Sequence, residues 1–458
     1  MKIWLMIGII FFVLALMKLY IFNVLRHTFM FSGHKIVLAL LLFGLYATEL
    51  AFFFLAKDKG FDHTTYIALS SSVILAYSLF VACLVGDMSL RAGRFVLHTL
   101  DSSAKPVEST KDSHRDFTRD STLEAGTESM KAESTRIKSI RVESSPTIDV
   151  QDTQEKQDTH IQVQPILETR LDSSIESKVH SVLDSNRRRF LKIMFDLGII
   201  ALFFLFSFKS VRGALSIPKV RDVEVKIKVL VREVRIAMIS DVHIGKMLQS
   251  DFVRGIVDKI NALNADIVVI VGDLVDEDIN FVREHLVLLN DLQSKEGVYY
   301  VSGNHEYYHG IDSILKFLKT LNLKVLDNAN IELESVNLCG VSDLAGATFN
   351  RYPPDIESAK QGRNLDKPSI LLAHQPKFVR RNDVSDFDLV LCGHTHAGQV
   401  FPLSFFVWLD QHYVHGLYTL DSKTQLYVSS GAGFWGPAIR FLAPSEIVNL
   451  TLKPYEDS

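Results

Sequence analysis

The chain has 458 residues, a formal net charge of −4 and 47% hydrophobic residues. Its near-neutral charge lacks the basic excess that is typical of nucleic-acid-binding proteins, so we expect no nucleic-acid partner. The 3 cysteines are too few for a disulfide framework. The length leaves room for more than one domain, and the composition changes sharply along it.

The first 98 residues predict a membrane region. Apolar stretches run from Ile3 to Phe22, from Ile36 to Leu55 and from Tyr66 to Val85. Each stretch is close to the roughly 20 residues that a helix needs to cross a bilayer. The stretches show almost no polar face, which a buried helix of a globular domain would show. We therefore expect three transmembrane helices in residues 1–98.

Two further segments connect this region to the C-terminal half. Residues 99–185 are rich in Ser, Thr and charged residues and hold too little apolar surface for a core, which predicts a disordered linker. Residues 186–210 contain a fourth apolar stretch, Phe190 to Phe208, which predicts a further transmembrane anchor. Asp196 lies inside this stretch, where a charge is costly in hydrocarbon.

The basic residues beside the apolar stretches predict an orientation. Lys18 and Arg26 lie near the first loop, and the run Arg187-Arg188-Arg189 precedes the fourth stretch. Because such residues favour the cytoplasm, the N-terminus and the C-terminal half would lie outside. Lys209 and Arg212 on the opposite flank oppose this orientation, and residues 186–192 also resemble a twin-arginine export signal. We expect a multi-pass protein of the cell membrane with an extracytoplasmic C-terminal domain.

Residues 223–455 predict one α/β domain. Short runs rich in Val and Ile, such as Val234–Ser240 and Ala265–Val271, alternate with segments of helical periodicity. This alternation is typical of layered domains with buried strands. About 230 residues are enough for one large core.

Five groups of polar residues each follow directly after a predicted strand. They are Asp241-Val242-His243, Gly272-Asp273-Leu274-Val275-Asp276, Gly303-Asn304-His305-Glu306, His374, and Gly393-His394-Thr395-His396. Sites in α/β sheets form beyond the carboxyl ends of strands, so we expect these groups to converge. Glycine before Asp273, Asn304 and His394 would permit close approach of the backbone.

The residue types in these groups predict a metal site. Asp, Asn and His without Cys suit zinc, manganese or iron rather than a thiolate site. Seven such ligands are too many for one tetrahedral ion and suit two divalent ions that share a carboxylate. Two-metal sites clamp the attacking and leaving oxygens in phosphoryl transfer and activate the attacking water. A neighbouring histidine that binds no metal would protonate the leaving group.

The motif series resembles the calcineurin-like metallophosphoesterase superfamily, in particular bacterial membrane-anchored members with a GHTHxGQ sequence. Residues 393–399 read GHTHAGQ, with Ala397 where glycine is common. The resemblance covers about Val223 to Leu452 and implies a two-sheet α/β sandwich flanked by helices. It implies that one metal is bound by Asp241, His243 and His396, that Asp273 bridges both metals, and that the second metal is bound by Asn304, His374 and His394. It further implies that His305 donates a proton to the leaving group or stabilises charge in the transition state, and that Asp276 and Glu306 orient the ligands.

We therefore expect a dinuclear-metal phosphohydrolase that cleaves a phosphomonoester, phosphodiester or pyrophosphate bond. Membrane anchorage makes a lipid-linked substrate, such as a lipid A precursor, a candidate, and no obligate protein partner is evident. The alternative is a catalytically retired sensor or scaffold at the membrane, although no metal ligand has been lost. For Arg440 a surface or packing role is expected rather than contact with a substrate phosphate. Asp343 is interpreted as a structural turn carboxylate.

Overall fold

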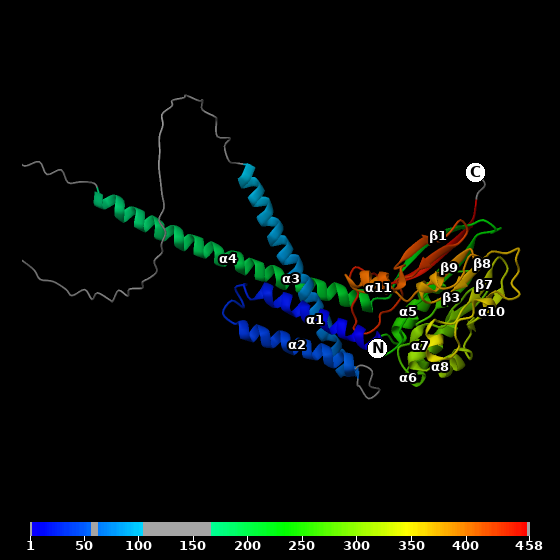
Figure 1. The fold of residues 1–458 in the computed structure, drawn as a ribbon. Helices are drawn as coiled ribbons and strands as arrows, with labels where there is room; N and C mark the ends of the chain where they lie inside the picture. Colours follow the sequence, from blue (N-terminus) through cyan, green and yellow to red (C-terminus); the bar gives the residue numbers. More distant parts are fainter. Residues whose placement is uncertain (1, 56–62, 104–165, 456–458) are drawn as a thin grey trace, which may run out of the picture. The chain divides into compact units, whose positions relative to one another are not determined.

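The computed structural model describes residues 2–55, 63–103 and 166–455 (Figure 1). Residues 1–91 and 189–458 form one compact unit, which contains the C-terminal α/β domain and most of the apolar helical region. Residues 92–188 form a second unit with the end of one long helix and the beginning of the next.

Four long helices precede the α/β domain, namely α1 (Lys2–Leu25), α2 (Lys35–Leu55), α3 (His63–Ser103) and α4 (Ile166–Leu215). Three of them, within the described ranges, are long and apolar enough to cross a membrane: Lys35–Leu55, His63–Val96 and Lys178–Leu215. They contain the second, third and fourth predicted stretches. The first predicted stretch lies in α1, whose apolar part Ile10–Leu25 is shorter.

The predicted linker overlaps the ends of two helices. Helix α3 continues to Ser103, and α4 begins at Ile166. Residues 104–165 of the predicted linker lie outside the described residues. The sequence holds no proline between Pro165 and Pro218, so nothing in it interrupts the helical hydrogen bonds of α4.

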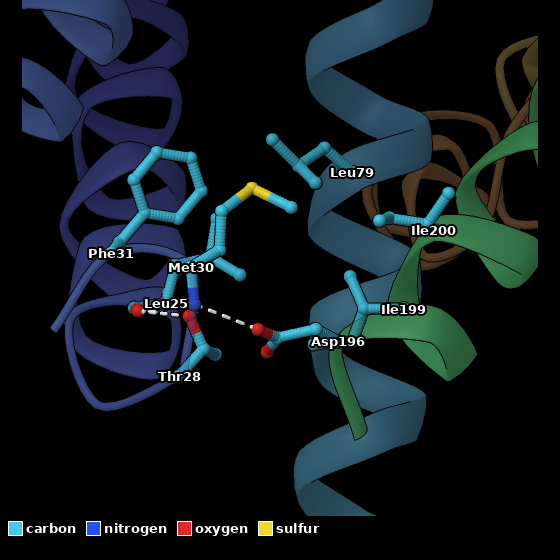
Figure 2. A pocket seen from close by; sticks show the side chains of 8 residues that line it. All are labelled: Leu25, Thr28, Met30, Phe31, Leu79, Asp196, Ile199 and Ile200. Atoms are coloured by element: carbon cyan, nitrogen blue, oxygen red, sulfur yellow. Dashed lines mark hydrogen bonds between the residues drawn. The ribbon is translucent and has the colours of Figure 1, made fainter. Parts of the chain in front are cut away.

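The four helices pack through a small apolar cluster that includes Ile21 of α1, Leu38 of α2, Cys83 of α3 and Ile199 of α4. Asp196, predicted to be costly in an apolar span, is buried and accepts a hydrogen bond of 2.8 Å from the backbone N–H of Met30. Figure 2 shows its carboxylate directed at the loop between α1 and α2. This bond offsets part of the cost of burying the carboxylate.

A second polar pair lies between two of these helices. The Lys18 ammonium on α1 is ion-paired with the Glu49 carboxylate on α2, and both side chains are buried. Pairing offsets part of the cost of burying the two charges between the helices.

The α/β domain contains two six-stranded mixed sheets. The first has the order β1 (Lys219–Ile227), β12 (Glu446–Pro454), β2 (Val234–Ile239), β3 (Ile267–Val271), β4 (Val298–Val301) and β5 (Lys324–Val325). The second has the order β10 (Gly416–Thr419), β11 (Gln425–Val428), β9 (Leu389–Cys392), β8 (Ser369–Leu372), β7 (Asn337–Gly340) and β6 (Ala329–Glu332). Strands β2 to β5 run parallel, as do β7, β8, β9 and β11.

Three apolar layers hold the sheets and helices together. Val269 and Tyr299 of the first sheet pack against Ile370 and Leu389 of the second, which forms the layer between the sheets. The other faces pack against the helices α5 (Ser250–Asn261), α6 (Ile279–Leu286), α7 (Asn304–His309), α8 (Ile311–Leu318), α9 (Ala345–Phe349) and α10 (Ile356–Lys360), and the short 3-10 helices η1 (Val287–Asp291) and η2 (Pro376–Arg380). The helix α11 (Leu403–Gln411) lies outside these layers, against η2 and the 3-10 helix η3 (His396–Gly398). The predicted two-sheet sandwich flanked by helices is confirmed.

Candidate metal centre

All five predicted groups lie at carboxyl ends of strands. Asp241 follows β2, Asp273 follows β3 and Asn304 follows β4 in the first sheet, and His374 follows β8 and His394 follows β9 in the second. The parallel strands of each sheet deliver their side chains to one edge, and the sandwich brings the two edges together. Residues more than 150 positions apart in sequence therefore face one another.

The first cluster consists of Asp241, His243 and His396, whose ligand atoms lie within 4.8 Å of one another. The Nε2 atoms of His243 and His396 are 2.9 Å apart, and Nε2 of His396 is 3.5 Å from Oδ1 of Asp241. All three residues are buried. Two imidazole nitrogens and a carboxylate oxygen that converge in this way form a donor set for a divalent ion.

The second cluster consists of Asp273, His374 and His394, whose ligand atoms also lie within 4.8 Å of one another. Nδ1 of His374 donates to the Val271 carbonyl at 2.9 Å, which leaves the Nε2 lone pair directed at Oδ2 of Asp273, 3.0 Å away. This hydrogen bond fixes the tautomer that a metal-binding histidine needs.

Asn304 and Asp273 complete the donor sets. The Asn304 side chain is buried, and its carbonyl oxygen has no hydrogen-bond partner in the protein. Such an orphaned acceptor is costly unless a cation or a donor satisfies it. Oδ2 of Asp273 lies 4.0 Å from Nε2 of His243 in the first cluster, so this carboxylate lies between the two clusters.

The charges of the site also fit cations. Three carboxylates, Asp241, Asp273 and Asp276, converge in a buried region. Burial, together with neighbouring His374, lowers the pKa of His394 well below its usual range, and burial together with His243 has the same effect on the pKa of His396. Neutral imidazoles beside clustered carboxylates are the protonation states that metal binding requires.

The backbone at these positions is strained. Asp241, His243, Asp273, His394 and His396 all have φ values between 50° and 71°. Such values are uncommon for residues other than glycine and concentrate at functional sites. Backbone hydrogen bonds from Asp241 N–H to the Gly272 carbonyl and from His243 N–H to the Asp273 carbonyl hold two of these turns.

The three glycines predicted to allow close approach do so for ligand side chains. A Cβ atom at Gly272 would lie 2.4 Å from Nδ1 of His374, and one at Gly303 would lie 2.2 Å from Oδ1 of Asp273. A Cβ atom at Gly393 would lie 2.4 Å from Oδ2 of Asp241. Any side chain at these three positions would therefore displace a candidate ligand.

Asp276 connects the first cluster to His305. Its Oδ1 atom lies 2.7 Å from Nδ1 of His243 and 2.5 Å from Nδ1 of His305. Burial opposes its ionisation, but the two imidazoles outweigh burial and hold the pKa of Asp276 well below its usual range. A carboxylate there accepts a hydrogen bond from the Nδ1–H of His243 and leaves Nε2 free to bind an ion.

The imidazole of His305 faces two buried carboxylates. Burial lowers the pKa of its imidazole, but the facing carboxylates of Asp273 and Asp276 outweigh burial and raise that pKa to about 9. Its Nε2 atom is 3.9 Å from Oδ2 of Asp273, so the ring borders both clusters. His309, which lies in none of the five motif groups, joins Asp276 and His305 in a further close group.

Glu306 holds two of the ligand-bearing loops together. Its carboxylate accepts hydrogen bonds from the N–H groups of Gly303 at 2.7 Å, Leu274 at 2.7 Å and Asp273 at 3.1 Å. Burial raises the pKa of this carboxyl to about 7. Glu306 therefore organises the loops after β3 and β4, as expected of a residue that orients ligands.

Arg440 is tied to the site from a distant part of the sequence. It is buried, and one terminal nitrogen lies 2.8 Å from Nδ1 of His396. Its other donors bind the carbonyls of Gly433 and Ala443. The packing role expected for Arg440 is confirmed, but it also contacts a candidate ligand, which the sequence alone did not indicate.

Asp343 has the structural role that was expected. It accepts hydrogen bonds from the Ala345 N–H at 2.7 Å and from the Gln375 side chain at 2.8 Å. These bonds close a turn after β7 and brace the residue that follows His374.

Comparison with known proteins agrees with this geometry. Residues 234–398 match the family model described as calcineurin-like phosphoesterase. A metallophosphoesterase of Campylobacter jejuni is 47% identical over 271 residues, which cover 59% of this chain and 72% of that protein. One from Helicobacter pylori is 48% identical over 270 residues, 59% of this chain and 73% of that protein. A transmembrane protein with a metallophosphoesterase domain from Danio rerio is 35% identical over 252 residues, 52% of this chain and 57% of that protein. The chain therefore belongs to the calcineurin-like metallophosphoesterase family.

Proposed function

We propose that this protein is a multi-pass membrane phosphohydrolase whose site holds two divalent ions bridged by Asp273. The observation that carries the proposal is the pair of donor clusters on either side of the Asp273 carboxylate. Asp241, His243 and His396 would hold one ion, and Asn304, His374 and His394 the other. Manganese, zinc and iron all suit these donors. When bound, the two ions would activate the attacking water and neutralise charge on the phosphoryl group.

The residues around the ions carry the remaining steps. His305, whose pKa is raised by the facing carboxylates of Asp273 and Asp276, would donate a proton to the leaving oxygen. Asp276 would hold both His305 and His243 in the required orientation through its Oδ1 atom. Glu306 would keep Asp273 and Asn304 in register through the loop N–H groups that it binds.

The substrate we propose is a phosphate ester or pyrophosphate carried by a lipid, such as a lipid A precursor. Three helices long and apolar enough to cross a membrane support a bilayer location. The proposal includes no nucleic-acid partner and no obligate protein partner. It places the α/β domain outside the cytoplasm, because Arg187 to Arg189 precede the apolar part of α4.

The reaction is tested with the full chain in lipid nanodiscs. Hydrolysis of p-nitrophenyl phosphate and bis-p-nitrophenyl phosphate is measured with added manganese, zinc or iron, beside the Asp273→Asn variant. We expect metal-dependent turnover that falls at least about a hundredfold in the variant, because the shared ligand weakens. The preferred ester separates monoesterase from diesterase activity.

Elemental analysis of the same sample separates the proposal from its alternative. About two ions per chain with turnover support the dinuclear enzyme, and one ion contradicts the bridging role of Asp273. Two ions without turnover on either ester would favour the sensor or scaffold. A folded chain without metal would contradict the ligand assignment.

Orientation needs a separate experiment. A reporter fused after Ser458, such as alkaline phosphatase, is active only outside the cytoplasm. A green fluorescent protein fusion at the same position reports the opposite side. Fluorescence without phosphatase activity would contradict the extracytoplasmic placement.

A further inference from the structure

An apolar surface lies beside the candidate metal centre and is not explained by catalysis. Helix α11 and the neighbouring loop expose Phe401, Phe405, Phe406, Trp408, Leu409 and Leu442, each between 44% and 76% exposed. We call these six residues the α11 surface. Contiguous exposed apolar side chains mark a surface that contacts a partner or a membrane. The one charged residue of α11, Asp410, is paired with Lys377.

The α11 surface adjoins helices that are long and apolar enough to cross a membrane. The hydroxyl of Tyr77 on α3 donates to the carbonyl of Phe401. The ring of Phe441, next to Leu442, packs 6.2 Å from Tyr77 and 5.3 Å from Phe206 on α4, measured between ring centroids. Tyr77 lies 14 residues after the start of α3 at His63, or about 20 Å along the helix.

These contacts determine the level of the α11 surface relative to the bilayer. Tyr77 and Phe206 lie inside the apolar parts of α3 and α4, not at their polar ends. When those parts cross the bilayer, Phe401 and Phe441 are at the level of lipid. We infer that the α11 surface inserts into the bilayer and holds the metal centre against membrane lipids.

A bilayer fits this surface better than other occupants. Aromatic and leucine side chains on one short helix are typical of segments that lie in the membrane interface. Residues 104–165 of the same chain are rich in Ser, Thr and charged residues, so their composition does not complement it. The continuity with α3 and α4 places lipid, rather than a second copy, at this surface.

Hydrogen bonds and a β-bridge connect the loops beside the α11 surface to the loop that carries His396. Gln399, three residues after His396, donates to the Trp435 carbonyl at 2.9 Å and accepts from the Trp435 N–H at 3.2 Å. Val400 forms a β-bridge with Phe441, and the adjacent Arg440 contacts His396. The metal centre therefore cannot move far from the bilayer plane. Its substrate, in an inference that rests on the proposed function, is a phosphate ester whose apolar part stays in the membrane.

The insertion is tested without any activity measurement. The chain has 3 tryptophans, so replacing Trp4 and Trp435 by Phe leaves Trp408 as the single fluorophore on α11. In nanodiscs we expect lipids brominated on their acyl chains to quench Trp408 and aqueous acrylamide to quench it weakly. The control carries Val231→Trp in a tryptophan-free background, because Val231 is 86% exposed before β2 at the opposite edge of the sheet. Equal acrylamide quenching at both positions, with no quenching by lipid, would overturn the insertion.

The access of lipid substrates is tested with phosphatidic acid in the same nanodiscs as probe. Wild-type protein should cleave it, or be inhibited by it in p-nitrophenyl phosphate hydrolysis. The double variant Phe405→Ser/Phe406→Ser should weaken either effect at least about tenfold, because two aromatic contacts with lipid are lost. Its turnover of p-nitrophenyl phosphate should match that of the Leu365→Ser control, at a residue 81% exposed before β8.

The outcomes separate this inference from the proposed function. Phosphatidic acid that is neither cleaved nor inhibitory, or an unchanged response in the double variant, would overturn lipid access through the α11 surface. If the wild-type protein hydrolyses no soluble ester, the proposed phosphohydrolase function is contradicted. The quenching experiment still decides whether the α11 surface inserts into the bilayer.

Discussion

The environment of His305 indicates which step of the reaction this residue would assist. Its pKa is raised to about 9 because Asp273 and Asp276 outweigh the effect of burial, so the ring carries a proton over most of the physiological range. A proton donor matters most when the leaving oxygen is basic, and least for p-nitrophenolate.

We therefore expect His305→Ala to lower kcat for an alkyl phosphate by about 10²–10⁴-fold and to affect p-nitrophenyl phosphate much less. In the wild type, kcat for the alkyl ester should fall as the pH rises through the pKa of His305, since the acid form exists only below that pKa. Steady-state kinetics across pH, with the two esters side by side, measure both effects. Equal losses on both esters would contradict the role as proton donor and favour stabilisation of charge.

Arg440 connects the backbone of helix α4 to the metal centre. Its backbone N–H donates to the Ser210 carbonyl of α4 at 3.0 Å, and its side chain contacts Nδ1 of His396. Methionine would fill much of its volume but would leave the carbonyls of Gly433 and Ala443 without donors. Each such acceptor costs about 1–3 kcal/mol when buried.

Arg440→Met should lower the free energy of unfolding by about 3 kcal/mol and strengthen metal binding, because the guanidinium donates to Nδ1 of His396, keeps the ring proton on Nε2 and repels a cation. Thermal unfolding and calorimetric titration of Mn²⁺ measure the two effects. Arg235→Met is the matched control, because the Arg235 side chain is 53% exposed and pairs only on the surface with Glu233. Lower stability with unchanged metal affinity would restrict Arg440 to a packing role.

At the scale of elements, the turns after the strands set the site. The Gly303 Cα lies against Asp273, with room for a hydrogen but not for a methyl group. Gly303→Ala should displace the Asp273 carboxylate and reduce metal-dependent turnover by at least about tenfold. The variant should also bind fewer than two metal ions per chain. Gly362→Ala is the control, because its φ of 75° adds strain while no atom lies within 4 Å of the new Cβ. Comparable metal content in both variants would contradict the close approach.

The strand ends explain which parts of the site were predictable from sequence. Each ligand group follows an apolar run directly, so local sequence indicated both the strand and the side chain at its end. The bond of Asp276 to both His243 and His305 depends on how two loops meet and had no local signal. Arg440 lies 44 residues from His396, and only the tertiary fold brings them together.

Helix ends were predicted less well than helix interiors. The apolar stretches indicated α2, α3 and α4, but α3 continues to Ser103 and α4 begins at Ile166 in polar sequence. Composition distinguishes segments that can build a core from those that cannot, whereas the hydrogen bonds of a helix can continue into polar sequence that holds no proline. The apolar run in α11 resembles a core helix by composition, and its exposure becomes evident only in the fold.

At the scale of the whole molecule, the apolar helices and the α/β domain share one core. Ile74 and Tyr77 of α3 and Ala214 of α4 belong to the same buried cluster as Ile239 and Ile256 of the domain. The predicted boundary at residue 223 therefore divides a packed interface. The Arg440 N–H bond to Ser210 crosses the same boundary.

We expect residues 218–458, expressed without the helices, to be less stable than the full chain in nanodiscs. Removing α3 and α4 exposes apolar side chains of the core to water, at about 25 cal/mol per Å² of apolar surface. A loss of about 3 kcal/mol would lower the Tm by roughly 6–12 °C for a domain of this size. Differential scanning fluorimetry at matched metal concentration measures the shift. Because Arg440 would lose its backbone partner on α4, its contact with His396 should loosen and the metal affinity should change along with the stability. Adding metal should recover part of the lost Tm, because the ions bind the folded domain. A domain that keeps the Tm and metal affinity of the full chain would show that the helices serve only as an anchor.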